Sequence, residues 1–176
     1  LDEHLRALRL PGILANYRRI AGDDAAKLSF LQELVALEVD RRHENGVRAR
    51  IAAARFPVIK TIESFDFSLQ AQLPKAKLLA LLDGRFVSDN INPILVGPTG
   101  VGKTHVLTAI GLAACTAGYR VLFTTAAELC MNLITAKRED RLKQRLANYE
   151  RFQLILIDEL GYVPFEKEAT DLLYQV

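Results

Sequence analysis

Cysteine and histidine are scarce in this sequence of 176 residues. The two cysteines, Cys115 and Cys130, lie in apolar stretches with a helical pattern, and the three histidines are scattered along the chain. This distribution excludes a disulfide framework and offers no spacing typical of metal ligands. We therefore expect a protein of a reducing compartment, the cytoplasm.

Long apolar runs and a strong excess of one charge are also absent. No run approaches the roughly 20 residues that span a bilayer, and residues 1–10 carry too much charge for a signal peptide. The sequence therefore predicts neither secretion nor membrane insertion. With 23 basic and 21 acidic residues, the net charge is only +2, which argues against a histone-like protein that binds through bulk charge. Any basic surface must be local.

The composition is that of a globular chain, since 50% of the residues are hydrophobic and 25% are charged. Both ends nevertheless have the pattern of a fragment. The chain does not begin with methionine, and residues 169–176 stop inside an apolar helical pattern.

Residues 1–60 predict a small helical domain that binds DNA or a partner, because apolar residues recur there at helical spacing and no strand pattern is present. Ser29 and Gln32 have the spacing of a capping box, which predicts the start of a helix. Asn45 and Gly46 are expected to interrupt or end it. A further alanine-rich helix would stop before Pro57. We place the boundary with a second domain, residues 61–176, in the segment 57–68.

The second domain alternates helical patterns with short, almost wholly apolar runs. Such runs are typical of strands buried on both faces of a parallel sheet. The runs are 94–96, 121–123 and 154–157, and the expected helices are 75–82, 103–117, 126–136 and 140–149. The predicted fold is therefore α/β, a parallel sheet sandwiched by helices.

A phosphate-binding loop follows the first apolar run and opens a helix. It consists of Gly97, Pro98, Thr99, Gly100, Val101, Gly102, Lys103 and Thr104, which match the P-loop spacing. Glycines let backbone N–H groups face phosphate oxygens, and the helix N-terminus adds partial positive charge. Lys103 is expected at the β- and γ-phosphates and the Thr104 hydroxyl at Mg²⁺. The alternative is a glycine-rich turn with a solvated lysine, but the four fixed positions rarely match by accident.

Two carboxylates, Asp158 and Glu159, follow the last apolar run. Ligands of open α/β sheets bind at the carboxyl ends of the strands. We therefore expect Asp158 to hold the magnesium shell and Glu159 to polarise the water that attacks the γ-phosphate. The alternative is an acidic pair that only faces water.

A basic stretch, residues 41–60, carries six basic residues against one glutamate in a chain of net charge +2. The DNA-binding candidates are Arg41, Arg42, Arg48, Arg50 and Arg55. A local cationic face suits the phosphate backbone of duplex DNA. The alternative is a solvated or salt-bridged helix surface, and for a second basic stretch, residues 137–151, we favour that alternative.

With the two nucleotide motifs in place, the chain resembles the AAA+ ATPases of the DnaC and IstB group, whose IstB members assist insertion-sequence transposition. The segments that carry the resemblance are 8–12 (Leu-Arg-Leu-Pro-Gly), 65–67 (Phe-Asp-Phe), 97–105, 158–162 (Asp-Glu-Leu-Gly-Tyr) and 164–165 (Pro-Phe). The Leu-Pro-Gly start and the Gly-Tyr tail are more similar to IstB than to DnaC. The resemblance implies a P-loop NTPase that binds and hydrolyses ATP with Mg²⁺, forms a homo-oligomer on duplex DNA and delivers this target to the transposase of the same element.

The resemblance also implies a strand between the P-loop strand and the Asp158 strand, and an arginine that acts on a neighbouring subunit's nucleotide. Neither lies in this chain, so we expect the two strands not to be neighbours and ATP hydrolysis by this chain alone to be negligible. The alternatives are a DnaC-like helicase loader, a non-catalytic nucleotide-gated DNA-binding module and a small-molecule P-loop kinase.

Three further side chains lie near these motifs. His105 follows the P-loop and is included among the expected cofactor-binding residues, although without a second metal ligand nearby its side chain is expected to be packed or at the surface. Phe65 and Phe67 are expected in the core rather than against an adenine ring. Tyr162 is expected to contact a partner, DNA or the sheet edge.

Overall fold

The computed structural model describes residues 1–70, 73–161 and 167–176, so Tyr162, Pro164 and Phe165 lie outside the described residues. The chain divides into two compact units, Leu1–Arg48 and Ala49–Val176. This division comes earlier than the domain boundary predicted at residue 60. Within the described ranges, no helix has both the length and the apolar character needed to cross a membrane.

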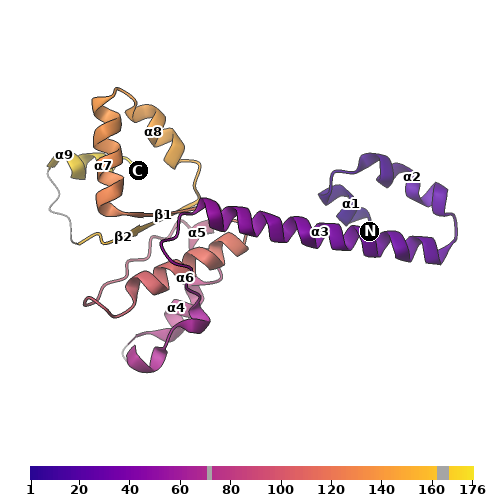
Figure 1. The fold of residues 1–176 in the computed structure, drawn as a ribbon, viewed down its shortest axis with the longest axis horizontal. Helices are drawn as coiled ribbons and strands as arrows, with labels where there is room; N and C mark the ends of the chain where they lie inside the picture. Colours follow the sequence, from indigo (N-terminus) through magenta and orange to yellow (C-terminus); the bar gives the residue numbers. More distant parts are fainter. Residues whose placement is uncertain (71–72, 162–166) are drawn as a thin grey trace. The chain divides into compact units, whose positions relative to one another are not determined.

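The first unit consists of α1 (Asp2–Ala7), α2 (Pro11–Ala21) and the first part of α3 (Ala25–Ala53). Pro11 is the first residue of α2, a position where its missing N–H costs nothing. Figure 1 shows α1 and α2 on the same side of α3. The core between them is formed by the buried residues Leu5, Leu8, Tyr17 and Val35, with Leu1, Leu10, Leu14, Leu28, Leu31 and Val39 packed against them.

Helix α3 differs from the prediction at both of its expected limits. Asp24 precedes the helix, and its Oδ1 accepts hydrogen bonds from the backbone N–H groups of Ala26 and Lys27. Ser29 therefore lies inside the helix, and the predicted capping box is wrong. A carboxylate already caps the first turn, so no second cap is needed.

The predicted break at Asn45 and Gly46 is also wrong, because α3 continues through both residues to Ala53. A glycine inside a helix costs only about 1 kcal/mol relative to alanine. Ion pairs at i,i+4 lie on both sides of the expected break, Glu38 with Arg42 and Glu44 with Arg48. The helix stops two residues before Arg55, whose φ of 62° is left-handed.

The second unit begins with the end of α3 and contains most of the remaining elements. They are η1 (Ile62–Ser64), η2 (Phe67–Gln70), α4 (Lys75–Leu81), α5 (Arg85–Ser88), α6 (Lys103–Thr116), β1 (Val121–Thr125), α7 (Ala126–Arg138), α8 (Leu142–Tyr149), β2 (Leu154–Asp158) and α9 (Lys167–Leu173). The four helices predicted in this region are therefore present. Gly84 and Gly118, which follow two of them, have positive φ angles of 75° and 102°.

Strands β1 and β2 form a parallel pair whose register runs from Val121 opposite Leu154 to Thr125 opposite Asp158. Figure 1 shows the pair between α6 on one side and α7 and α8 on the other. The end of α3 and α6 pack with both strands around Cys115, Phe123 and Leu156, while α7, α8 and α9 form a second core around Leu133. The predicted α/β architecture, with helices on both faces of a parallel sheet, is confirmed.

The predicted strand 94–96 is not a strand in the structure. Among the described residues, the only strand ladder is that between β1 and β2. Leu95 packs against the core under α6, but Ile94 and Val96 are 76% and 91% exposed. An extended segment becomes a strand only when a neighbour satisfies its N–H and C=O groups. The apolar run leading into the P-loop therefore has the alternation of a strand without its ladder.

Candidate functional site

The loop 97–102 joins this extended segment to the start of α6. Gly100 and Gly102 have φ angles of 82° and 91°, a region that residues with a Cβ rarely adopt. Gly102 is the residue before the first turn of α6, and its carbonyl accepts the N–H of Val106 at 3.0 Å. The glycine spacing in the sequence therefore places Lys103 and Thr104 in the first turn of the helix, where unpaired N–H groups favour an anion.

The Lys103 side chain lies over this loop. Its Nζ donates hydrogen bonds to the carbonyl oxygens of Gly97, at 2.9 Å, and Pro98, at 2.6 Å. The ammonium group is therefore held by the same backbone that the sequence predicts to surround phosphate oxygens. Because both partners are neutral carbonyls, an anion would attract this cation more strongly.

The Thr104 hydroxyl and the Asp158 carboxylate meet directly, although they are 54 residues apart. Thr104 Oγ1 donates a hydrogen bond of 2.7 Å to Asp158 Oδ2. Asp158 Oδ1 accepts the backbone N–H of the next residue, Glu159, at 2.9 Å. The structure thus brings the two predicted nucleotide motifs together at the carboxyl end of β2.

Glu159 follows β2 with a left-handed φ of 60°, and its side chain is exposed. Strand β2 ends at the preceding residue, Asp158. Two adjacent carboxylates therefore differ in environment, since Asp158 is hydrogen-bonded and half-buried while Glu159 is open to solvent. This difference is what separate roles for the two groups would require.

Phe65 supports the phosphate loop from beneath, a contact that the sequence analysis did not predict. Its ring is 8% exposed, and a Cβ added to Gly102 would lie 2.7 Å from Phe65 Cε2. Phe67 packs against the Phe65 ring with a centroid distance of 4.9 Å. Both phenylalanines therefore belong to the core, as predicted, and Phe65 determines how close the backbone at Gly102 can come. The period-two phenylalanines were the only signal in the sequence.

His105 belongs to the same contact. Its ring packs edge-on against Phe65 at 5.1 Å, and its Nε2 lies 2.8 Å from the carbonyl oxygen of Thr61 and 3.2 Å from Ser64 Oγ. Because a carbonyl oxygen only accepts, the Nε2 atom carries the proton. His105 thus connects the first turn of α6 to the segment 61–65, in agreement with a packed residue.

Gly111 is a second residue whose role sequence reasoning missed. It lies in the middle of α6, and a Cβ there would lie 2.5 Å from Leu156 Cδ1 and 2.6 Å from Phe56 Cε1. The missing side chain lets β2 and the segment after α3 approach the helix that carries Lys103 and Thr104. A glycine inside an apolar helical pattern is a sequence signal for such a close approach.

The five arginines proposed for DNA binding do not form one free cationic surface. Arg42 bonds to Glu38 and to the carbonyl oxygen of Leu8, and Arg50 donates to the carbonyl oxygen of Cys115 near the end of α6. These two guanidinium groups therefore have structural partners.

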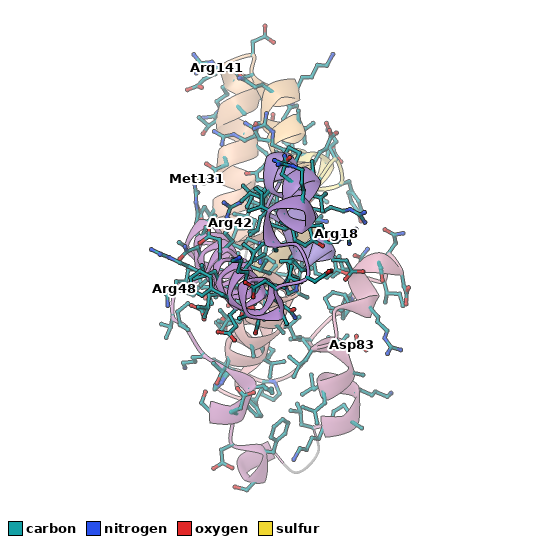
Figure 2. All side chains as sticks on the ribbon, turned by 90° about the vertical axis from the view of Figure 1, so that its right-hand side faces the viewer. Arg18, Arg42, Arg48, Asp83, Met131 and Arg141 are labelled. Atoms are coloured by element: carbon teal, nitrogen blue, oxygen red, sulfur yellow. The ribbon has the colours of Figure 1, made fainter. Side chains whose placement is uncertain are left out.

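The other three arginines, Arg41, Arg48 and Arg55, are exposed. Arg48 has only a long contact of 3.8 Å with Glu44. Arg48 and the hydrogen-bonded Arg42 can be compared in Figure 2. Arg41 and Arg48 lie in the first unit and Arg55 in the second. Exposed arginines of this kind remain the candidates for phosphate contacts.

The second basic stretch is partly neutralised, in agreement with the preferred alternative. Lys137 pairs with Glu168 at 2.7 Å and Arg141 with Glu139 at 3.6 Å. The hydrogen bond from Lys137 holds the pKa of the Glu168 carboxyl below its usual value. The Lys137–Glu168 pair joins α7 to α9, whereas the Arg141–Glu139 pair lies between the end of α7 and the start of α8.

The cysteines take no part in the site. Both Cys115 and Cys130 are buried free thiols, and burial raises the pKa of each. A raised pKa keeps a thiol protonated and therefore poorly reactive. They act as small core residues of α6 and α7.

Comparison with known proteins gives the family. The model of the family described as IstB-like ATP binding protein matches residues 3–176. The chain is 37% identical to the ATP-binding protein of insertion sequence IS232 from Bacillus thuringiensis, over 85% of this chain and 61% of the relative. It is also 37% identical to the ATP-binding protein of insertion sequence IS21 from Pseudomonas aeruginosa, over 84% of this chain and 56% of the relative.

An insertion-sequence ATP-binding protein from Sinorhizobium fredii is 34% identical over 98% of this chain and 59% of its own length. The chain thus spans between 56% and 61% of the length of these three relatives. The matched region includes both nucleotide motifs and the helical first unit. This chain, an α/β protein with a P-loop, belongs to the family of IstB-like ATP-binding proteins.

Proposed function

We propose that this chain is the ATP-hydrolysing switch of an insertion sequence, which assembles on duplex DNA and assists the transposase of the same element. The observation that carries the nucleotide part is the hydrogen bond between Thr104 and Asp158. It joins the first turn of the P-loop helix to the carboxyl end of β2, next to Lys103 and Glu159. These four side chains have the chemistry that phosphoryl transfer to water needs.

The residues at this position fit a magnesium ion. Mg²⁺ prefers hard oxygen ligands, and in nucleotide sites it is held by one or two protein oxygens together with phosphate oxygens and water. The structure brings a hydroxyl oxygen, Thr104 Oγ1, and a carboxylate oxygen, Asp158 Oδ2, to one place, where they are hydrogen-bonded at 2.7 Å. When bound, the ion would neutralise the charge of the β- and γ-phosphate oxygens. Thr104 and Asp158 would hold it, the latter directly or through water.

Lys103 and Glu159 would act on the nucleotide itself. The Nζ of Lys103 already lies at the carbonyl oxygens of Gly97 and Pro98, so a small movement would transfer it from these neutral acceptors to phosphate oxygens. Glu159 is exposed beside Asp158 and could orient the attacking water and accept its proton. The N–H groups of the glycine loop would bind the remaining phosphate oxygens.

The DNA and transposase parts of the proposal are supported by the relatives and by the exposed arginines. Three relatives are named as ATP-binding proteins of insertion sequences, which favours transposition over helicase loading. Arg41, Arg48 and Arg55 offer charge for phosphate contacts. Assembly as a homo-oligomer on DNA and a cytoplasmic location remain part of the same proposal.

The test measures MgATP binding, ATP turnover and DNA binding for the wild type and for the variants Lys103→Ala and Glu159→Gln. We expect Lys103→Ala to lose nucleotide binding, because the cation that faces the phosphates is removed. In a protein with the full length of the relatives, where turnover is expected, Glu159→Gln should keep nucleotide binding, lose turnover and prolong the life of DNA complexes. Wild-type nucleotide affinity in Lys103→Ala would show that the loop is not the phosphate site.

A second candidate function, nucleotide-gated DNA binding without turnover, is favoured by one observation. The run 94–96 that leads into the P-loop is not paired with β2, and Ile94 and Val96 are exposed. Water positioning needs the two motifs held rigidly, and an unpaired segment holds one of them loosely. ATP-dependent DNA binding with no phosphate release, in both the wild type and Glu159→Gln, would support this candidate.

A further inference from the structure

Helix α3 of the first unit has two apolar faces. One face contributes Leu28, Leu31, Val35 and Val39 to the core with α1 and α2. At 100° per residue, Phe30, Leu34 and Leu37 project from the opposite side of the helix. They are exposed, Phe30 to 65% and Leu37 to 66%. Figure 1 shows α1 and α2 on one side of α3 only.

Charged residues continue the exposed apolar line toward the end of the unit. Lys27 precedes it, and Arg41, Glu44 and Arg48 follow it. We call the following set the outer stripe: Lys27, Phe30, Leu34, Leu37, Arg41, Glu44 and Arg48. Its members are separated alternately by three and four residues, the spacing of the a and d positions of a coiled coil. The spacing predicts that another helix can pack along the whole stripe.

We propose that the outer stripe is an interface for a second copy of this chain, packed antiparallel against the first. In the register that the charges favour, Leu34 of each copy contacts Leu37 of the other. Phe30 then lies against Arg41, whose stem covers the ring while the guanidinium group makes a cation–π contact. Lys27 lies opposite Glu44 and forms an ion pair. Each contact occurs twice because the two-fold axis repeats it.

The parallel arrangement is disfavoured by the same residues. It would stack Phe30, Leu34 and Leu37 on their own copies, which is acceptable. It would also place Arg41 against Arg41, Glu44 against Glu44 and Arg48 against Arg48, and like charges in direct opposition destabilise a helix pair. The charge order along the stripe therefore selects the antiparallel orientation.

The charge contacts require little rearrangement within each copy. Lys27 pairs with Asp24 at 3.0 Å and Arg48 with Glu44 at 3.8 Å. The side chains of Lys27, Glu44 and Arg48 are largely exposed, and that of Asp24 is half-buried. Exposed ion pairs of this kind contribute little, so exchanging them costs little.

The dimer is expected to be weak. Only three apolar side chains per copy are buried, which corresponds to the low end of protein interfaces. Glu33 and Asp40 border the stripe and add like charge along one flank of the pair. We therefore expect a dissociation constant on the order of 10 µM.

The test is sedimentation velocity of the purified chain from about 1 to 200 µM, without nucleotide or DNA. We expect the wild type to dimerise in this range. Leu37→Glu should weaken the dimer at least about tenfold, because each copy would bury a carboxylate against an apolar side chain. The matched control is Ile20→Glu, since Ile20 is 69% exposed but lies on α2. It should dimerise like the wild type, and circular dichroism should show the same helix content in all three proteins.

Charge exchange tests the register. Lys27→Glu places a glutamate opposite Glu44 and should weaken the dimer, while the double variant with Glu44→Lys should restore it. In a parallel dimer, residue 27 of one copy would not lie opposite residue 44 of the other. The second substitution would then not restore dimerisation. Monomers at every concentration would overturn the proposal, and so would equal dimerisation by Leu37→Glu and wild type. A monomeric chain in which Leu37→Glu weakens only DNA or transposase binding would assign the stripe to a different partner.

Discussion

The Thr104 hydroxyl donates a hydrogen bond of 2.7 Å to the Asp158 carboxylate and so joins the P-loop helix to the carboxyl end of β2. The two residues belong to motifs 54 positions apart in the chain. Their contact turns two separate sequence patterns into one oxygen-lined site beside the Lys103 ammonium. Three variants follow directly from this geometry and from the packing beneath it.

Asp158→Asn should weaken nucleotide binding in the presence of Mg²⁺ and have little effect in EDTA. The amide keeps the shape and can still accept the Thr104 hydrogen bond, but it lacks the charge that a divalent ion prefers. Titration of a fluorescent ATP analogue with and without Mg²⁺ measures both affinities. Equal loss in the two conditions would show that Asp158 acts on the fold and not on the ion.

Phe65→Leu should weaken nucleotide binding about five- to tenfold, because the ring no longer supports Gly102 in its left-handed conformation. The matched control is Phe86→Leu. Phe86 is 7% exposed in the same core as Phe65 but lies on α5. If the melting temperature and the nucleotide affinity decrease by the same amounts in both variants, Phe65 stabilises the unit without positioning the loop.

Gly111→Ala should destabilise the second unit by about 1–3 kcal/mol, because the new Cβ would overlap Leu156 and Phe56. The better helix propensity of alanine, about 1 kcal/mol, offsets only part of this cost. Urea denaturation measures the change. Gly12→Ala on α2 is the control, since a Cβ there meets nothing within 4 Å. A stabilised Gly111→Ala would mean that Phe56 and Leu156 move aside freely.

Asp24 should make the stability of the first unit depend on pH. Hydrogen bonds from Lys27 and from backbone N–H groups lower the pKa of the Asp24 carboxyl. A group whose pKa is lower in the folded state stabilises it above the unfolded pKa, and this contribution is lost as the pH falls through the folded pKa. Asp24→Asn keeps a capping oxygen without the titration.

The difference in melting temperature between wild type and Asp24→Asn should therefore be constant near neutral pH and shrink in acid. A difference that stays the same down to pH 2 would contradict the charged cap.

At protein concentrations well below the dissociation constant of the proposed dimer, where the outer stripe is not paired, replacing Arg41, Arg48 and Arg55 together by alanine should make DNA binding less dependent on salt. Each lost phosphate contact reduces the slope of log affinity against log salt by about 0.9, so three contacts correspond to about 2.7. Arg42 and Arg50 are left in place because they hold Glu38, Leu8 and Cys115. The control removes equal charge from α7 and α8, through Arg138, Lys143 and Arg145. A larger change in the control would move the DNA surface to those helices.

Local patterns were sufficient to predict the P-loop, the acidic pair after β2 and most helices of the second unit. Glycine spacing, helix periodicity and helix-ending glycines depend on near neighbours in the chain, so they can be read along it. The IstB resemblance rested on the same short motifs, and the family match over residues 3–176 confirmed it.

Contacts between segments that are distant in the chain decided the features that local patterns did not predict. The sequence could not show that Asp24 caps α3 before Ser29, that Phe65 lies under Gly102, or that Arg42 and Arg50 have carbonyl partners. An apolar run such as 94–96 has the pattern of a strand whether or not a neighbour pairs with it. A strand, a buried ring and a free charge are each defined by what lies beside them in space, and only the tertiary structure supplies that neighbour.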